Sequence, residues 1–269
     1  MKKSYKAVFV DLDGTFLDNY ENYENPVSQV NLDMARELNK NSHFIISTGR
    51  TNSDFVMNLA RQTNSKYVIC QNGAIIVDQN NNILRNNLIS SADANAIKKY
   101  LEAKQIHYTI NGLKKIFTCR PEAIKLNRPW AKEFVKLPYI IGELEMPINR
   151  LLAFGLATET QTCELAAEIE SQFPNLRAFL VSNGLSLEIT SKESSKGIGN
   201  QFVCDLLGIS PTQALHIGDS GNDTCVKEQG FDLVLLDNAL DSIKSYADHI
   251  GEHFRNGGFA KTIKKICEL

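Results

Sequence analysis

Residues 7–15 of the chain read Ala-Val-Phe-Val-Asp-Leu-Asp-Gly-Thr, four apolar residues followed at once by two acids. A short unbroken apolar run is typical of a strand that is buried on both faces, so Asp11 and Asp13 should stand at its carboxyl end. Two carboxylates two residues apart at a strand end point towards the same small volume, which is costly unless a cation lies between them. Hard oxygen ligands of this kind suit Mg²⁺. The alternative is a loop that merely begins with a turn-forming Asp and Gly.

Four further apolar runs end in the same way, each followed by glycine or polar residues: 44–46, 67–70, 214–217 and 233–236. Stretches with apolar residues at helical spacing separate them, at 27–38, 55–60 and 198–207. Strands that alternate with helices predict an α/β fold with a doubly wound, mainly parallel sheet. Ligands of such sheets bind at the carboxyl ends of the strands, where these polar residues fall.

The alternation is interrupted between residues 84 and 189. Residues 74–77 and 83–84, on either side of an Asn-rich turn, predict a β-hairpin. After it we expect helices near 92–101 and 161–173, and strands near 108–110, 115–117, 151–154, 177–182 and 185–190. We therefore predict a core domain built from residues 1–83 and 190–269, and an α+β domain inserted at 84–189.

A second acidic motif is Gly218-Asp219-Ser220-Gly221-Asn222-Asp223, which again follows an apolar run. It places Asp219 at a strand end and Asp223 in the first turn of a predicted helix. Either acid alone could be an ordinary helix N-cap. Together with Asp11 and Asp13, however, they bring four carboxylates to one edge of one sheet.

Polar residues at two other positions complete the predicted site. Ser47-Thr48-Gly49-Arg50 follows another strand and offers hydroxyls, an amide and a guanidinium to a phosphate group. Lys196 stands at the start of a predicted helix, where the helix dipole disfavours a cation. A lysine fits there if it neutralises carboxylate or phosphate. Taken singly, Thr48 and Lys196 are also compatible with ordinary surface or capping residues.

The motifs Asp11-x-Asp13-Gly14-Thr15, Ser47-Thr48-Gly49-Arg50, Lys196-Gly197 and Gly218-Asp219-x-x-Asn222-Asp223 occur in this order. In this they resemble the four motifs of the haloacid dehalogenase-like (HAD) hydrolases. Asn72-Gly73-Ala74 and the long insert are similar to the Cof-type sugar-phosphatase branch, whose members carry an α+β (type IIB) cap. The resemblance thus implies a Rossmann-like HAD core, with the insert as its substrate-specificity cap.

The resemblance also implies roles for these residues. Asp11 would be the nucleophile and Asp13 the general acid and base, while Thr48 and Lys196 would stabilise the transferring phosphoryl group. Mg²⁺ would be held by Asp11, the Asp13 backbone carbonyl, Asp219 and, directly or through water, Asp223. We expect the remaining motif residues to bind or orient the phosphate: Ser47, Gly49, Arg50, Asn72, Gly73 and Asn222. An acid at position 13 suits cleavage of a phosphate ester rather than dehalogenation.

The chain departs from the family pattern near its end. The family usually shows Asn a few residues before Asp-Gly-Val-Ala, but this chain reads Phe-Arg-Asn-Gly-Gly-Phe-Ala at 254–260. This departure leaves open whether a late Asn reaches the site. In the cap, the candidate substrate contacts are Lys114, Lys115, Arg120 and Asn183.

Composition narrows the classes of function. The chain has 29 Lys+Arg against 31 Asp+Glu, which is too balanced for a protein that mainly binds nucleic acid. Its six widely spaced cysteines are typical of reduced thiols in a cytoplasmic protein, and we expect neither a signal peptide nor a membrane span.

Together these features predict a magnesium-dependent phosphatase, a phosphoric monoester hydrolase that acts on a small phosphorylated metabolite through an aspartyl-phosphate. The alternatives are a phosphomutase and a non-catalytic phosphate- or metal-binding regulatory module. No oligomeric state is predicted.

Overall fold

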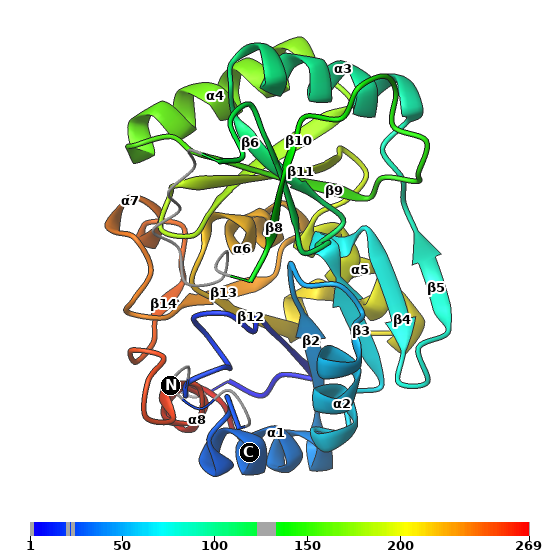
Figure 1. Ribbon diagram of the computed structural model, residues 1–269. Helices are drawn as coiled ribbons and strands as arrows, with labels where there is room; N and C mark the ends of the chain where they lie inside the picture. Colours follow the sequence, from blue (N-terminus) through cyan, green and yellow to red (C-terminus); the bar gives the residue numbers. More distant parts are fainter. Residues whose placement is uncertain (1–2, 20–21, 23–24, 123–132, 269) are drawn as a thin grey trace. The chain divides into compact units, whose positions relative to one another are not determined.

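The computed structural model describes residues 3–19, 22, 25–122 and 133–268, and the chain divides into two compact units. Unit 1 consists of Met1–Asn86 and Ser195–Leu269, and unit 2 of Asn87–Ser194. Both ends of the chain therefore contribute to unit 1 (Figure 1). Among the described residues, no helix combines the length and the apolar character needed to cross a membrane.

Unit 1 is built on an eight-stranded sheet with the strand order β14-β13-β12-β1-β2-β3-β4-β5. The first six of these strands run parallel to one another, whereas β4 pairs antiparallel with β3 and forms the predicted antiparallel hairpin with β5. The strands are β1 (Ala7–Val10), β2 (His43–Ser47), β3 (Tyr67–Cys70), β4 (Ile75–Asp78), β5 (Ile83–Asn86), β12 (Ala214–Gly218), β13 (Asp232–Leu235) and β14 (His249–Ile250).

Helices cover both faces of this sheet because successive residues of its central strands point to opposite faces. Val8 and Val10 join one apolar core with helices α1 (Gln29–Asn41), α2 (Asp54–Gln62) and α8 (Gly258–Ile266). Ala7 and Phe9 join the other core, with α5 (Lys196–Leu207), α7 (Asp241–Lys244) and the short helix η4 (Cys225–Gln229). The remaining short helices are η1 (Gln71–Gly73), η3 (Pro211–Gln213) and α6 (Gly221–Thr224). The predicted doubly wound α/β fold is thus confirmed.

Strand β1 marks the point at which the strand order reverses. The chain leaves β1 for β2 on one side, and later returns to β12 on the other. The register pairs Val10 with both Ile46 and Ile217, so these three strands end at the same level. In open α/β sheets, ligands bind outside the carboxyl ends of the strands at such a reversal. Asp11, Thr48 and Asp219 directly follow the last residues of β1, β2 and β12 in the sequence.

Unit 2 contains a six-stranded sheet with the order β10-β11-β9-β6-β7-β8. Helices α3 (Ser91–Ala103) and α4 (Glu159–Gln172) share one apolar core with this sheet. The strands are β6 (His107–Ile110), β7 (Lys115–Thr118), β8 (Val135–Pro138), β9 (Arg150–Phe154), β10 (Leu176–Val181) and β11 (Ser186–Ser191). Strand β8 is absent from the sequence expectation because Val-Lys-Leu-Pro is a mostly exposed edge strand with no clear apolar run.

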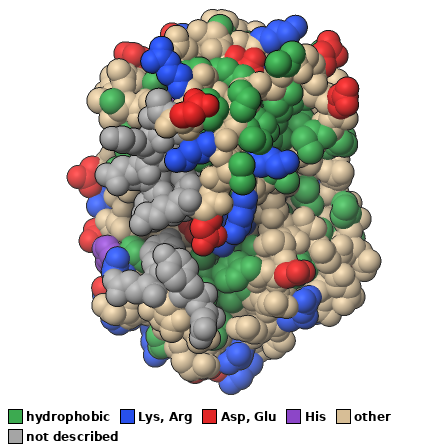
Figure 2. Space-filling model, viewed as in Figure 1, with side chains coloured by type: hydrophobic (Ala, Val, Ile, Leu, Met, Phe, Trp, Pro, Cys, Tyr) green, Lys and Arg blue, Asp and Glu red, His purple; other side chains and the backbone are tan. Residues whose placement is uncertain are grey.

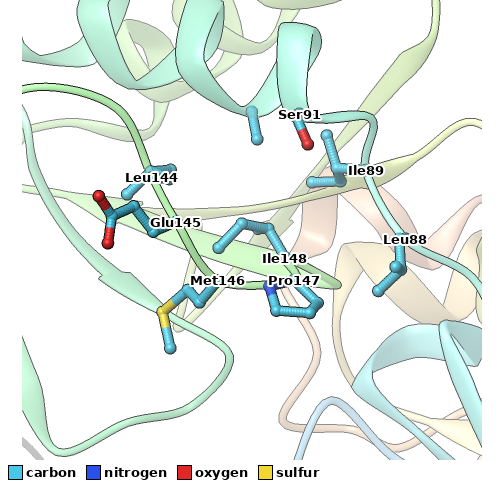
Figure 3. A pocket seen from close by; sticks show the side chains of 9 residues that line it. Leu88, Ile89, Ser91, Leu144, Glu145, Met146, Pro147 and Ile148 are labelled. Atoms are coloured by element: carbon cyan, nitrogen blue, oxygen red, sulfur yellow. The ribbon is translucent and has the colours of Figure 1, made fainter.

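The surface of unit 2 carries several large apolar side chains (Figure 2). The exposed ones are Leu88, Leu113, Val135, Ile141 and Met146. A small pocket of about 230 Å³ opens between the start of α3 and residues 144–148 (Figure 3). Seven of the nine residues that line it have apolar side chains, and the other two are Ser91 and Glu145.

Candidate active site

Four charged side chains meet at the carboxyl edge of the unit 1 sheet. Asp11 directly follows β1 and Asp219 directly follows β12, while Asp223 lies in α6 and Lys196 is the first residue of α5. Ligand oxygens of the three aspartates all lie within 4.8 Å of one another. The Lys196 Nζ donates to Asp11 Oδ1 at 2.6 Å and to Asp223 Oδ1 at 2.7 Å.

The electrostatics of this carboxylate cluster favour binding of a cation. Three carboxylates face one ammonium group, and Asp11, Asp223 and Lys196 are buried. Burial, together with the negative charges of Asp223 and Asp13, raises the pKa of Asp11 to about 7 despite Lys196. Partial burial and the charges of Asp11 and Asp223 also raise the pKa of Asp219. A divalent cation would relieve this repulsion, and the oxygen donors are those that Mg²⁺ prefers.

Unlike Asp11 and Asp219, Asp223 has a lowered pKa. Burial alone would raise the pKa of Asp223, but Lys196 and a hydrogen bond from His216 outweigh burial and lower it. Its Oδ1 accepts from Lys196 and from His216, and its Oδ2 accepts from the backbone N–H groups of Asp219 and Ser220. These four hydrogen bonds occupy the lone-pair positions of the carboxylate. Asp223 is therefore held in one orientation by Lys196, His216 and two backbone N–H groups.

Asp13 and Arg50 form a pair of their own. The Arg50 guanidinium donates two hydrogen bonds to the Asp13 carboxylate, at 2.7 Å from Nε and 2.6 Å from Nη2. Both side chains are about half exposed. Arg50, expected to bind phosphate, therefore holds the expected general acid and base.

Thr48, Asn72 and Asn222 are linked to one another by hydrogen bonds at the strand ends. Thr48 is fully buried, its N–H donates to Ile69 O, and its carbonyl accepts from the Asn72 N–H at 3.1 Å. Asn72 has the left-handed conformation, with φ 54° and ψ 43°. In this conformation its side-chain Oδ1 accepts from Asn222 Nδ2 at 3.0 Å, which links the end of β3 to α6.

Ser47 and Gly73 have contacts different from the expected phosphate contacts. Ser47 is fully buried in β2, and its hydroxyl donates to Asn200 Oδ1 at 2.9 Å. A Cβ at Gly73, which has φ +84°, would lie 2.2 Å from the backbone oxygen of Ser195. Gly73 thus permits close packing of η1 against the start of α5. Gly49 lies between Thr48 and Arg50 in the strand-end loop.

Sequence reasoning missed Asn238, which contacts the cluster. Its Nδ2 donates to Asp219 Oδ2 at 3.0 Å and to Gly14 O at 2.9 Å, and its Oδ1 accepts from the Phe254 N–H. A late asparagine therefore does reach the site, from the end of β13 rather than from residues 254–260. The sequence contains a signal for this contact, because Asn238 follows one of the five apolar runs, as the predicted site residues Asp11 and Asp219 do.

Sequence reasoning also missed His216 and Asn200, which lie behind Asp223. Both are fully buried, and His216 Nε2 donates to Asp223 Oδ1 at 2.8 Å. In the sequence, the histidine inside an otherwise apolar strand is the feature that indicates a buried polar contact.

Comparison with known proteins agrees with this geometry. The family of haloacid dehalogenase-like hydrolases matches residues 8–263. The 5-amino-6-(5-phospho-D-ribitylamino)uracil phosphatase YcsE of Bacillus subtilis (strain 168) is 27% identical over 264 residues, covering 96% of this chain and 94% of that protein. The phosphoglycolate phosphatase of Methanococcoides burtonii is 27% identical over 266 residues, covering 98% and 95%.

A solved structure, that of a HAD subclass IIB sugar phosphatase, shares the fold with a TM-score of 0.75 and 19% identity, covering 97% of this chain and 98% of that one. The chain belongs to the haloacid dehalogenase-like hydrolase family, as a phosphatase of its Cof-type branch. The predicted family and enzyme class are thus confirmed.

Proposed function

We propose that the protein is a magnesium-dependent phosphatase that hydrolyses a small phosphorylated metabolite through an aspartyl-phosphate at Asp11. The observation that carries this proposal is the contact of Lys196 with both Asp11 and Asp223, beside Asp219. A buried nucleophile next to a fixed ammonium and an acidic cation site is the arrangement that phosphoryl transfer needs, because catalysis there is mostly positioning and charge stabilisation.

In the proposed first step, an Asp11 carboxylate oxygen forms a bond to phosphorus while the bond to the substrate oxygen breaks. Asp13 gives its proton to the leaving oxygen. In the second step Asp13 takes a proton from water, whose oxygen bonds to phosphorus and releases Asp11 and inorganic phosphate. Asp13 is accessible for this exchange, since its side chain is 49% exposed. Lys196 and the Thr48 hydroxyl would stabilise the negative charge on the transferring group.

The proposed Mg²⁺ would be held by the Asp11 carboxylate, the Asp13 backbone carbonyl and Asp219, with Asp223 reaching it directly or through water. Its contribution would be Lewis-acid charge next to the phosphoryl oxygens. Asn238 and Thr15 orient Asp219, since both donate to its carboxylate.

The substrate class is supported by the names of the relatives, which act on a phosphorylated ribitylaminouracil and on phosphoglycolate. Both are small organic molecules with one phosphate ester. We propose that unit 1 is the catalytic core, and that unit 2 is the cap that selects among such molecules. The free thiols of all six cysteines support a reducing, cytoplasmic location.

The test is release of inorganic phosphate from a panel of small phosphate esters, with Mg²⁺ and with a chelator. We expect turnover of one or more esters only when Mg²⁺ is present, and no turnover by Asp11→Asn. Absence of phosphate release by the wild-type protein across the panel, or equal release by Asp11→Asn, would refute the proposal. Transfer of phosphate to a second sugar instead of water would identify a phosphomutase.

A further inference from the structure

A chain of buried hydrogen bonds leads from the interior of unit 1 to Asp223. It begins at Ser47 Oγ, which donates to Asn200 Oδ1 at 2.9 Å. Asn200 Nδ2 lies 3.0 Å from His216 Nδ1, and His216 Nε2 lies 2.8 Å from Asp223 Oδ1. Four elements contribute to this chain, β2, α5, β12 and α6, and all four side chains are fully buried.

The hydrogen-bond directions follow from Asp223, whose carboxylate only accepts, so His216 Nε2 donates to it. Because the Ser47 hydroxyl donates to Asn200 Oδ1, the amide NH₂ of Asn200 faces the imidazole. An amide NH₂ only donates, so His216 Nδ1 must accept. A neutral imidazole that accepts at Nδ1 carries its proton at Nε2, which is the atom that faces Asp223.

Asp223, at the end of this series of hydrogen bonds, contacts Lys196. Asp223 Oδ1 accepts from both His216 and Lys196, and the same Lys196 ammonium donates to Asp11 at 2.6 Å. A rotation of the Asp223 carboxylate would break the His216 contact at Oδ1 together with the two backbone contacts at Oδ2. His216 thus holds the oxygen that Lys196 contacts, while the backbone holds the other, and the direction in which Lys196 points towards Asp11 depends in part on His216.

Packing alone does not explain a histidine at this place. Its neighbours in β12 are Leu215 and Ile217, and an apolar side chain there would need no buried partners. Burying an imidazole is costly unless both of its nitrogens are hydrogen-bonded, and here both are.

We propose that His216, held by Asn200 and Ser47, is a positioning residue that fixes Asp223 and thereby aims Lys196 at Asp11. This inference rests on the proposed phosphatase function, in which Asp11 attacks phosphorus. His216 acts only through Asp223, and it touches neither substrate nor metal.

The test compares three changes in the full-length protein, using the best ester from the panel. His216→Leu removes the donor, and we expect kcat to fall about 10- to 100-fold with KM within about twofold, as for other groups that orient site ligands. His216→Gln should restore most of kcat, because its amide can donate to Asp223 and its oxygen can accept from Asn200. Leu233→Ala, which changes the buried partner of His216 in β13, should lower the melting temperature but leave kcat unchanged.

Wild-type kcat in a folded His216→Leu variant, or equal losses in the Leu and Gln variants, would overturn the inference. A ¹⁵N spectrum of the wild-type histidines provides a measurement that does not depend on the variants' folding. It should show a protonated Nε2 and a bare Nδ1 at His216, whereas a bare Nε2 would contradict the inference. Failure of the proposed function would look different, because the wild-type protein itself would then release no phosphate.

Discussion

Lys196 is the side chain on which the charge balance of the site depends. It is fully buried, and it faces two buried carboxylates at hydrogen-bond distance. Burial disfavours its charge, but Asp11 and Asp223 outweigh burial and raise the pKa of Lys196. The helix dipole would disfavour a cation at the first position of α5, so these carboxylates account for its presence.

Lys196→Met should therefore destabilise the protein as well as inactivate it. The substitution keeps most of the side-chain volume but leaves two buried carboxylates without their partner, which costs about 3–5 kcal/mol. Urea unfolding in the presence of a chelator measures this loss, and added Mg²⁺ should recover part of it. A variant as stable as the wild type with chelator present would contradict the charge balance described for the cluster.

The affinity for Mg²⁺ should depend on pH. Burial and nearby negative charges raise the pKa of Asp11 to about 7, so below that pH a cation must displace a proton from Asp11. We expect affinity to fall as the pH is lowered from 8 to 5.5, by at least about tenfold per unit below the pKa, because the pKa of Asp219 is raised as well. Calorimetric titration with Mg²⁺ at several pH values measures this.

The matched control for the pH dependence is Asp241→Asn, because Asp241 is an exposed acid outside the cluster. It should show the wild-type pH dependence. An affinity that stays constant between pH 5.5 and 8 would show that Asp11 is not a proton-linked ligand.

Most of the site residues that the sequence predicts lie just after apolar runs, whereas Lys196 and Asp223 are predicted from their places at the starts of helices. Asp11 and Asp219 each follow such a run, and the positions of the strand ends are set by the parallel register. His216 and Asn200 were missed because their role depends on which faces of β12 and α5 meet, and spacing along the chain does not specify this. The sequence predicts that Arg50 binds phosphate, because nothing in it indicates the pairing of Arg50 with Asp13.

At the scale of elements, the position of Lys196 depends on the stability of the first turn of α5. The Ser195 side chain caps α5 by accepting from the Ile198 N–H at 3.1 Å, and Lys196 is the next residue. Helix α5 ends at Gly208, which has the left-handed conformation with φ 65°. The N-cap thus fixes the turn from which Lys196 projects.

Ser195→Ala should cost about 1 kcal/mol of stability and also lower kcat, since it loosens the first turn of α5. Ser90→Ala is the matched control, because Ser90 caps α3 in unit 2 through the Asp93 N–H. The control should lose similar stability with unchanged kcat. Thermal unfolding and steady-state kinetics on both variants check this, and equal kinetic losses would contradict a specific role for α5.

The sequence predicts helices and strands where the apolar residues extend far enough along the chain to show a helical or strand periodicity. The predicted helix near 92–101 corresponds to Ser91–Ala103, and the predicted hairpin forms with its second strand extending to Asn86. The edge strand β8 and the two-residue strand β14 were missed because they are short and exposed, so burial leaves no pattern in their sequence.

At the scale of the whole molecule, the proposed metal ligands Asp11, Asp13, Asp219 and Asp223 all belong to unit 1. A ligand that binds the folded state stabilises the region that holds it. Mg²⁺ should therefore slow hydrogen exchange in β1, β12 and α6 more than in β9 and β11 of unit 2. Exchange followed by mass spectrometry on the full chain measures this, and equal protection of both units would contradict the assignment of the metal to unit 1.

The central claim is that Asp11 becomes phosphorylated during turnover, and trapping the phosphorylated enzyme tests it most directly. Asp13→Asn, supplied with Mg²⁺ and acetyl phosphate, should accumulate the intermediate because acetate leaves without an acid while water lacks its base. Borohydride reduction and peptide mass spectrometry should then find homoserine at position 11. Homoserine at another aspartate, or phosphate release by the wild type with Asp11 unmodified in the trapped variant, would contradict the account.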